Sequence, residues 1–246
     1  MNKIFFTFGN WRYSESVDAL CEQAKLYTDT VYGYREGDIP SWFYRKNKNL
    51  FKDNRGFGYW VWKAFFIKEL LNNAKEDDVF MYADAGNAII QDIAPLFNIC
   101  KNDEKGIILY DNSDGNMDHR NHKNAHWTKS DCFNLLGLAE QKYLQGNQVN
   151  ASYLTFRKND FSVKFFDVFL QACENYNIIS DAPNITENFN KDFIDHRHDQ
   201  SVLSLLSIRY NITVKRDPSQ WGMGRYNINS EYPQLFNHHR KNILNS

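Results

Sequence analysis

Residues 79–87 read Val79-Phe80-Met81-Tyr82-Ala83-Asp84-Ala85-Gly86-Asn87, and this stretch is the one that best indicates the fold class. Its run of apolar residues is typical of a strand that is buried on both faces of a sheet. An acidic residue and then a glycine follow, which would bring a carboxylate to the edge of the sheet and let backbone approach a ligand. Asp84 could equally cap a turn, so the motif alone leaves both roles open.

Strand-like and helix-like segments alternate along the rest of the chain. Strands are expected at residues 3–8, 30–34, 78–83, 106–110, 149–156 and 213–215, and helices at residues 14–27, 59–74, 130–136, 162–175 and 199–208. The alternation predicts an α/β fold with a mainly parallel central sheet flanked by helices. Ligands of such folds bind outside the carboxyl ends of the strands, so we expect Gly9, Tyr34 and Asp84 around one crevice.

The composition is that of a soluble globular protein. Of the 246 residues, 42% are hydrophobic and 24% are charged, which excludes an intrinsically disordered chain. A formal net charge of −1 gives no overall basic excess, so we expect no nucleic-acid partner. Aromatic residues make up 16% of the chain, enough both to fill a core and to stack on a ring-shaped ligand.

The sequence also bears on the compartment in which the protein works. The apolar run at residues 3–8 is too short for a signal peptide, and no apolar stretch reaches the roughly 18 residues of a membrane span. The four cysteines (Cys21, Cys100, Cys132 and Cys173) lie far apart without a CxxC pair. This pattern indicates reduced thiols in a cytoplasm rather than a disulfide framework or a zinc site.

A second informative segment, at residues 55–63, reads Arg55-Gly56-Phe57-Gly58-Tyr59-Trp60-Val61-Trp62-Lys63. Its glycines let backbone approach a ligand, and the start of the expected helix, with Arg55 beside it, would attract phosphate. Lys63 lies four residues after Tyr59 and so on the same helical face. The tryptophans could line a pocket, but at least two of the four large aromatic residues at positions 60–66 are expected in the core.

Polar residues gather in three further places. Residues 195–200 read Asp195-His196-Arg197-His198-Asp199-Gln200 at the expected start of a helix, where Asp199 could act simply as a cap. A cap does not need the histidines, the arginine or the carboxamide beside it. Residues 237–241 read Asn237-His238-His239-Arg240-Lys241 and form a solvated basic tail unless they fold back over phosphate. Residues 111–129, with His119, His122 and His126, are expected to form a long functional loop.

Four of these pieces, taken in order, resemble nucleotide-sugar-dependent glycosyltransferases of the GT-A fold. They are Thr7-Phe8-Gly9 at the end of the first strand, residues 55–63, the strand end at residues 82–86, and His198-Asp199-Gln200-Ser201-Val202-Leu203. The chain is similar in this respect to small bacterial and viral enzymes that build surface polysaccharide or lipopolysaccharide. The resemblance implies a single GT-A-like, Rossmann-like domain over residues 1–246. Residues 1–110 would bind the nucleotide sugar, and residues 111–246 would bind the acceptor and carry the catalytic groups.

The resemblance also implies which residues bind the donor. They are Thr7, Phe8, Gly9, Tyr34, Arg55, Trp60, Lys63, Asp84, Ala85, Gly86 and His238. The first four would hold the base and ribose, whereas the cationic side chains would face the ribose or diphosphate. The metal motif of the family is Asp-x-Asp, but its second acidic position is Gly86 here. A divalent cation, Mn²⁺ or Mg²⁺, would therefore be held by Asp84 and His238, with Asn87 or water completing its shell.

Sugar transfer from a nucleoside diphosphate makes two demands on the catalytic residues. Charge on the leaving diphosphate must be neutralised, by a cation or by Arg and Lys side chains. A polar group must also stand beside the anomeric carbon, either as the base of an inverting enzyme or as the stabilising group of a retaining one. Asp199 could act as the base of an inverting enzyme. Asp199 together with Gln200 could act as the stabilising group of a retaining enzyme. The Asp-Gln pair resembles retaining galactosyltransferases and glycogenin-type enzymes, which favours retention.

The function expected from this resemblance is transfer of a sugar from a UDP- or GDP-sugar to a glycan or lipid-linked saccharide acceptor. The pathway would be surface polysaccharide or lipopolysaccharide synthesis, in the cytoplasm or in peripheral contact with the inner face of a membrane. Residues 111–129 and the aromatic stretch at residues 42–51 are the candidates for acceptor binding and closure. Two alternatives remain. One is a metal-dependent phosphohydrolase or nuclease using Asp84, His196, His198 and Asp199, and the other is a non-catalytic carbohydrate-binding protein.

Overall fold

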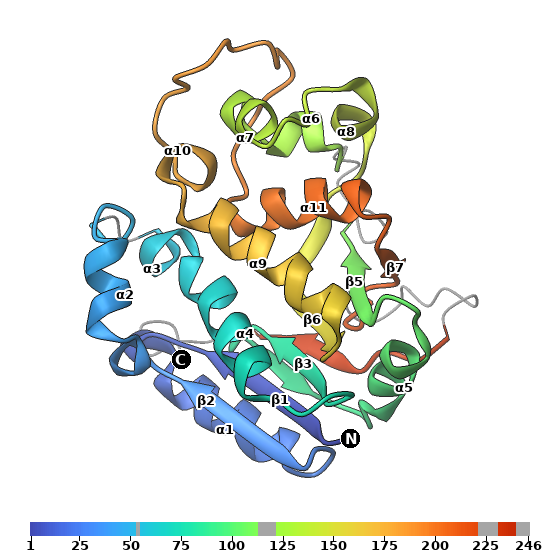
Figure 1. Cartoon of the computed structure of the whole chain (residues 1–246). Helices are drawn as coiled ribbons and strands as arrows, with labels where there is room; N and C mark the ends of the chain where they lie inside the picture. Colours follow the sequence, from blue (N-terminus) through green and yellow to red (C-terminus); the bar gives the residue numbers. More distant parts are fainter. Residues whose placement is uncertain (53–54, 113–121, 221–230, 240–246) are drawn as a thin grey trace.

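A six-stranded sheet forms the centre of the computed structural model, which describes residues 1–52, 55–112, 122–220 and 231–239 (Figure 1). The strand order is β2-β1-β3-β6-β5-β7. The strands are β1 (Lys3–Phe8), β2 (Thr30–Tyr34), β3 (Val79–Ala83), β5 (Ile107–Asp111), β6 (Val149–Arg157) and β7 (Thr213–Lys215). Only β6 runs antiparallel to its neighbours in this sheet. The predicted α/β class with a mainly parallel central sheet is therefore confirmed.

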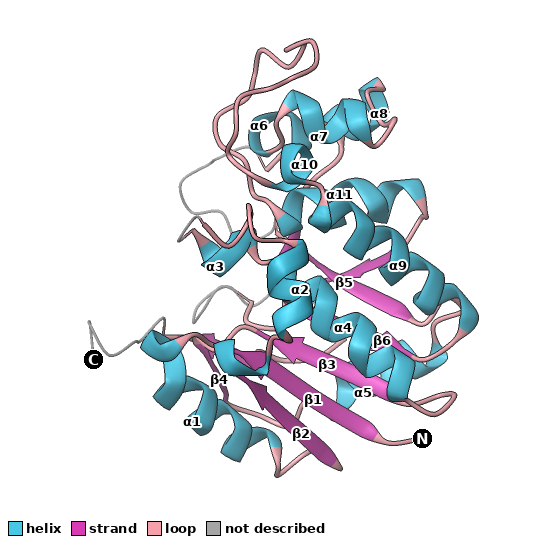
Figure 2. Ribbon diagram, turned by 60° about the vertical axis from the view of Figure 1, so that its left-hand side comes forward, coloured by secondary structure: helices cyan, strands magenta, loops and turns pink. Residues whose placement is uncertain are grey.

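In the described residues, five longer helices and several short ones surround this sheet. The longer ones are α1 (Ser14–Ala24), α4 (Val61–Asn73), α5 (Ala94–Asn102), α9 (Asp160–Glu174) and α11 (Asp199–Arg209). The short ones are η1 (Trp11–Tyr13), η2 (Glu36–Asp38), α2 (Ser41–Lys46), α3 (Gly56–Tyr59), α6 (Asn124–Trp127), α7 (Ser130–Leu135), α8 (Gln141–Gln145) and α10 (Tyr176–Ile179). Helices α6, α7, α8 and α10 gather at one end of the molecule, beyond α11 (Figures 1 and 2).

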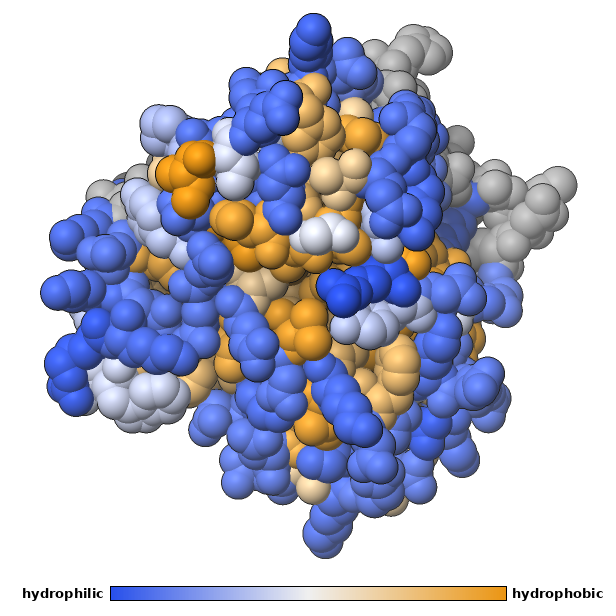
Figure 3. Space-filling view, turned by 45° about the horizontal axis from the view of Figure 1, so that its top comes forward, coloured by the Kyte–Doolittle hydropathy of each residue, from blue (hydrophilic) through white to orange (hydrophobic). Residues whose placement is uncertain are grey.

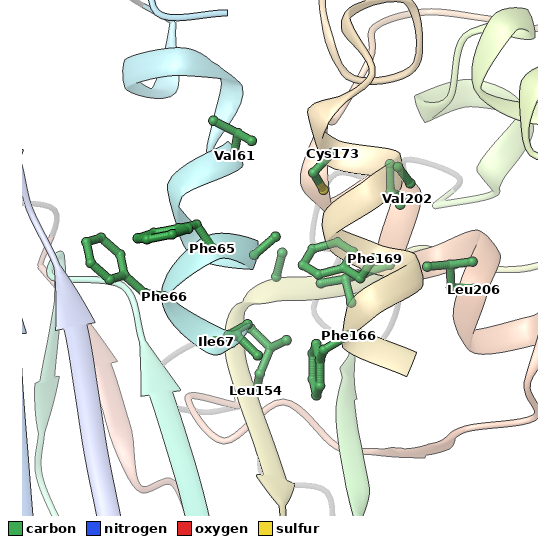
Figure 4. Close-up of a cluster of buried hydrophobic side chains, with 14 of the residues drawn as sticks. Val61, Phe65, Phe66, Ile67, Leu154, Phe166, Phe169, Cys173, Val202 and Leu206 are labelled. Atoms are coloured by element: carbon green, nitrogen blue, oxygen red, sulfur yellow. The ribbon is translucent and has the colours of Figure 1, made fainter. Parts of the chain in front are cut away.

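Side chains of the central strands alternate between two hydrophobic clusters, one on each face of the sheet. Phe6 and Tyr82 belong to the cluster under α4, α9 and α11, whereas Phe5 and Met81 belong to the cluster under α1 and α5. Figure 4 shows the first cluster, in which side chains from α4 and α9 meet above Leu154 of β6. Every residue of β3 is buried, as its unbroken apolar run predicts. Asp84 follows directly and is thus held at the carboxyl end of a rigid central strand.

The segment before α4 is not the right-handed helix start that the sequence predicts. Gly56, Phe57, Gly58, Tyr59 and Trp60 all have positive φ, between 50° and 86°, so they form a left-handed turn. Helix α4 begins only at Val61. The predicted phosphate-attracting helix start beside Arg55 is therefore wrong, because local propensity gives way to this turn, which costs about 1–2 kcal/mol for each non-glycine residue.

The second half of the predicted loop at residues 111–129 is ordered structure. Lys123 pairs with Asn147 in an isolated bridge, and α6 follows at once with three of its four residues buried. Residues 113–121, which include His119, lie outside the described residues. The prediction of a single long loop is thus wrong for residues 123–127, because Ala125 and Trp127 bury apolar side chains there.

Apolar side chains on the surface are interleaved with polar ones. The face shown in Figure 3 is largely hydrophilic, with hydrophobic side chains grouped toward its middle. Trp42 and Tyr44 of α2 are 53% and 44% exposed. Among the helices of the described residues, none combines the length and the apolar character that crossing a membrane requires.

Candidate active site

Two adjoining pockets open at the carboxyl ends of β1 and β3. The larger has a volume of about 430 Å³ and the smaller about 360 Å³, within the usual range for small-molecule sites. Trp60, Asp84 and Ser152 line both. The larger is lined by Phe8, Gly9, Asn10, Arg12, Tyr13, Gly56, Phe57, Trp60, Trp62, Asp84, Ala85, Gly86, Asn87, Ser152 and His238. The smaller is lined by Arg55, Trp60, Lys63, Asp84, Ala151, Ser152, Arg197, His198, Asp199 and Gln200.

A buried lysine joins the two carboxylates of this site. The Nζ atom of Lys63 lies 2.7 Å from Oδ2 of Asp199 and 3.7 Å from Oδ1 of Asp84. It also donates a 2.9 Å hydrogen bond to the carbonyl of Ala151 on β6. The Lys63 side chain is only 2% exposed, and that of Asp199 is 5% exposed. The structure therefore brings together Asp84, the segment that contains Lys63, and Asp199, as the resemblance implies.

Burial and the ion pair act against each other on the ionisation of this cluster. Burial alone would lower the pKa of the Lys63 ammonium, but the Asp199 and Asp84 carboxylates more than offset it and raise that pKa. Burial raises the pKa of the Asp199 carboxyl from 3.8 to about 6, although the Lys63 ammonium works in the opposite direction. The cluster thus carries a lysine that stays charged and an aspartate that titrates near neutral pH.

Asp84 is held in place by groups around its own turn. Its Oδ1 atom accepts a 2.5 Å hydrogen bond from the hydroxyl of Tyr82, and its backbone carbonyl accepts one from the amide side chain of Asn87. Burial raises the pKa of the Tyr82 phenol well above its ordinary value, so this hydroxyl remains a donor. Asp84 is therefore more than a turn cap, because its side chain reaches the buried cluster.

The C-terminal segment folds back over this turn. Strand β8 (Phe236–His238) pairs antiparallel with β4 (Asn87–Ile89), and the backbone N–H of His239 donates to the carbonyl of Gly86. His238 reaches the wall of the larger pocket in this way. The alternative of a basic tail in solvent is thus wrong for residues 237–239, because this segment is bonded to β4 and to Gly86. Arg240 and Lys241 lie outside the described residues.

Aromatic side chains form one wall of the larger pocket. The rings of Phe8 and Trp62 stack with their centroids 3.9 Å apart, and Phe57 lies 6.3 Å from Phe8. Thr7 is fully buried and Tyr34 stacks on Phe66 at 4.0 Å, and neither is among the residues that line these two pockets. Of the residues predicted around one crevice, the structure places Gly9 and Asp84 on the larger pocket, whereas Tyr34 is outside both linings.

Arg55 is the cation at the outer edge of the smaller pocket. Its guanidinium forms ion pairs with Asp181 at 3.0 Å and with Asp195 at 3.1 Å. Arg197, which lines the same pocket, lies over the ring of Trp127 at 4.5 Å. Arg55 therefore links the segment before α4 to the loop that leads into α11.

The two histidines before α11 do not form a metal cluster with the acidic residues. A ring nitrogen of His196 lies 2.9 Å from the carbonyl of Ile178, and one of His198 lies 2.7 Å from the carbonyl of Ile179. Burial lowers the pKa of both imidazoles, which keeps them neutral. Within the described ranges, no three His, Cys, Asp or Glu side chains are grouped so that they could hold a metal ion. Binding of Mn²⁺ or Mg²⁺ by Asp84 and His238 stays a prediction.

Several pocket residues escaped the sequence analysis. Asn10, Arg12 and Tyr13 follow directly after β1, so the rule that ligands bind beyond the carboxyl ends of strands could have identified them. Ser152 had no such signal. It reaches both pockets because β6 runs antiparallel beside β3, and its carbonyl accepts a hydrogen bond from the N–H of Asp84.

No protein-family model and no curated protein matches this sequence. Among solved structures, the chain is similar to the galactosyltransferase LgtC in complex with donor and acceptor sugar analogues. That likeness has a TM-score of 0.51 at 12% identity and covers 96% of this chain and 86% of LgtC. The chain also matches the glycosyltransferase GlyE of Streptococcus pneumoniae, with a TM-score of 0.42 at 13% identity over 89% of this chain. It spans 46% of GlyE, less than half of that protein. The likeness to LgtC shows that this chain has a GT-A-like fold.

Proposed function

We propose that this protein is a glycosyltransferase that moves a sugar from a nucleoside-diphosphate sugar to a saccharide acceptor. The observation that carries this proposal is the pair of adjoining pockets that share Asp84, with Lys63 and Asp199 beside it in the lining of the smaller pocket. One pocket offers aromatic rings and the other offers charged groups. A GT-A-like fold, similar to that of a galactosyltransferase solved with donor and acceptor analogues, supports the same reaction class.

The larger pocket suits the nucleotide of the donor. The half-buried rings of Phe57 and Trp60 offer aromatic surface to a base, and polar groups of Asn10 and Ser152 lie on the same lining. Binding sites for small molecules commonly combine an apolar wall with a few polar groups that fix orientation. The donor's diphosphate would then extend toward Asp84, where the two pockets join.

The smaller pocket suits the transferred sugar and its acceptor. Asp199 lines it, and so does Gln200, whose amide donates a 3.1 Å hydrogen bond to Gln148. During transfer the bond from the anomeric carbon to the diphosphate oxygen breaks, a bond to the acceptor oxygen forms on the same face, and the acceptor's hydroxyl proton passes to the departing diphosphate oxygen. A carboxylate and an amide beside one space could shelter the positive charge that develops at the anomeric carbon. We therefore propose retention of anomeric configuration.

The finer assignments remain proposals of the same kind. The donor is a UDP- or GDP-sugar, and the acceptor is a glycan or lipid-linked saccharide of surface polysaccharide or lipopolysaccharide synthesis in the cytoplasm or at the inner face of a membrane. The exposed rings of Trp42 and Tyr44 offer surfaces on which an acceptor sugar can stack.

Incubation with a panel of UDP- and GDP-sugars tests the reaction class. We expect release of the free nucleoside diphosphate from one donor, faster in the presence of a saccharide acceptor, with a product heavier by one sugar in mass spectrometry. Asp199→Asn should lower turnover far more than donor affinity. A chain that neither releases nucleoside diphosphate nor gains thermal stability with UDP or GDP, with or without Mn²⁺, would exclude the proposal.

A further inference from the structure

The residues around Asp84 make a poor site for a divalent cation. Mg²⁺ and Mn²⁺ favour several oxygen ligands, usually including one or two protein carboxylates. Here Gly86 replaces the second acidic residue of the motif, and His238 is the other residue predicted to ligate the ion. No group of three potential ligands of the His, Cys, Asp and Glu types exists in the part of the chain that the structure describes.

A fixed cation already stands beside Asp84. The Lys63 ammonium is 3.7 Å from the Oδ1 atom of Asp84, and the same oxygen accepts the hydroxyl of Tyr82 at 2.5 Å. The ammonium is fastened there by Asp199 at 2.7 Å and by the carbonyl of Ala151 at 2.9 Å. Since Lys63 is almost fully buried, it cannot swing into solvent, and a metal ion bound to Asp84 would face a like charge at close range.

We infer that Lys63 compensates the charge of Asp84 in place of a metal ion, so that sugar transfer by this protein needs no divalent cation. Asp84 then accepts hydrogen bonds from hydroxyl groups of the donor instead of ligating a metal. This inference rests on the proposed function for the transfer step, but its statement about metal binding does not depend on it.

The charge of the leaving diphosphate is met by protein cations in this arrangement. Arg12 of η1 is among the residues that line the larger pocket, and so is Asp84. Lys63 weakens the repulsion that Asp84 would exert on a phosphate oxygen, while the same ammonium also pairs with Asp199. Fixed charges of this kind stabilise a developing anion without reorganisation at the moment of reaction.

The first arm of the test uses Mn²⁺ alone, without any sugar. The melting temperature of the wild-type chain should not change on addition of Mn²⁺, whereas Gly86→Asp, which restores the second carboxylate, should melt a few degrees higher in its presence. Gly86 is not among the described residues with positive φ, so its backbone conformation does not require a glycine. Gly86→Ala is the matched control, because it adds a side chain without a carboxylate.

The second arm measures transfer after treatment with EDTA. We expect wild-type turnover to change less than twofold, with or without added Mn²⁺. Loss of turnover in EDTA with recovery on Mn²⁺ would overturn the inference. So would a thermal shift of the wild type with Mn²⁺ that disappears in Asp84→Asn. If no donor is turned over at all, the proposed function fails, while the Mn²⁺ titration still decides whether the wild-type chain holds a metal.

Discussion

At the scale of single residues, the ionisation of Asp199 sets the pH dependence. Burial raises the pKa of its carboxyl to about 6, so the ionised form that pairs with Lys63 is lost as pH falls through about 6. We therefore expect kcat/KM, which reports groups of the free enzyme, to fall roughly tenfold per pH unit below that value. A profile of kcat/KM between pH 5 and 8 measures this fall. Asp199→Asn is the control, because its residual kcat/KM should no longer fall in this way below pH 6. A flat profile in the wild type would show that the charge of Asp199 is not needed.

The same ion pair makes a prediction about stability. Lys63→Met leaves the carboxylate of Asp199 buried without its cation, which should lower the free energy of unfolding by about 3–5 kcal/mol. Adding Asp199→Leu removes the stranded charge, so the double variant should be less destabilised than the sum of the two single changes. Urea denaturation of the four proteins measures this coupling. Strict additivity would mean that the two side chains do not interact.

The pair also shows what the sequence can predict about a site. Asp84 and Asp199 were identified because each stands where a regular element ends or begins, and such ends are visible in a hydrophobic pattern. The close contact between Lys63 and Asp199 was not visible, because it joins residues 136 positions apart through packing of α4 and α11 around β6. Spacing along one helix says nothing about a partner on another.

At the scale of elements, the left-handed turn at residues 56–60 differs from the helix start that the sequence predicts there. The sequence predicts a helix that starts at Tyr59, introduced by residues 55–58, yet Gly56, Phe57, Gly58, Tyr59 and Trp60 all have positive φ. The turn folds Trp60 back over Gly56, and the indole N–H of Trp62 donates a 3.0 Å hydrogen bond to the carbonyl of Gly56. Such a turn depends on tertiary contacts, which outweigh the local preference of the non-glycine residues.

Gly56→Ala tests how much this turn matters. A Cβ at this position would lie 2.2 Å from the ring of Trp60, in a residue with φ of +56°. We expect a loss of about 1–3 kcal/mol in stability and a weaker affinity for the nucleotide, because Phe57 and Trp60 line the pockets. Gly37→Ala is the matched control, since a Cβ there meets nothing within 4 Å. If Gly56→Ala and Gly37→Ala changed stability and nucleotide affinity equally, the left-handed conformation at Gly56 would not be required for either property.

At the scale of the whole molecule, the strand and helix pattern was predictable and the closure of the chain was not. The sequence predicts the six strands of the main sheet, and four of them, β1, β3, β5 and β6, are runs of mostly buried residues that an apolar pattern marks. Strands β4 and β8 are only three residues long and lie about 150 positions apart. Nothing in so short a segment marks its partner. Only the resemblance suggested that His238 lies near Asp84, and the pairing of β8 with β4 that brings it there is visible only in the tertiary structure.

This closure should couple the stability of the C-terminal segment to the binding of the donor. Phe236 of β8 is fully buried against Tyr153, with ring centroids 5.0 Å apart, and its neighbours in the chain cover the turn that carries Asp84. Phe236→Ala should cost about 3–5 kcal/mol of unfolding free energy, as expected for a large buried ring. It should also weaken nucleotide binding, because the pairing of β8 with Asn87 would loosen.

Phe97→Ala separates these two effects. Phe97 of α5 is 1% exposed and belongs to the same hydrophobic cluster, but it lines neither pocket. Its loss should cost a similar free energy of unfolding while leaving the Kd for the nucleotide unchanged, as measured by calorimetry at a temperature where both variants are folded. If the Kd for the nucleotide rose equally in both variants, the lower stability of the whole fold would explain the result. A loss confined to Phe236→Ala would mean that β8 holds the Asp84 turn in its binding geometry.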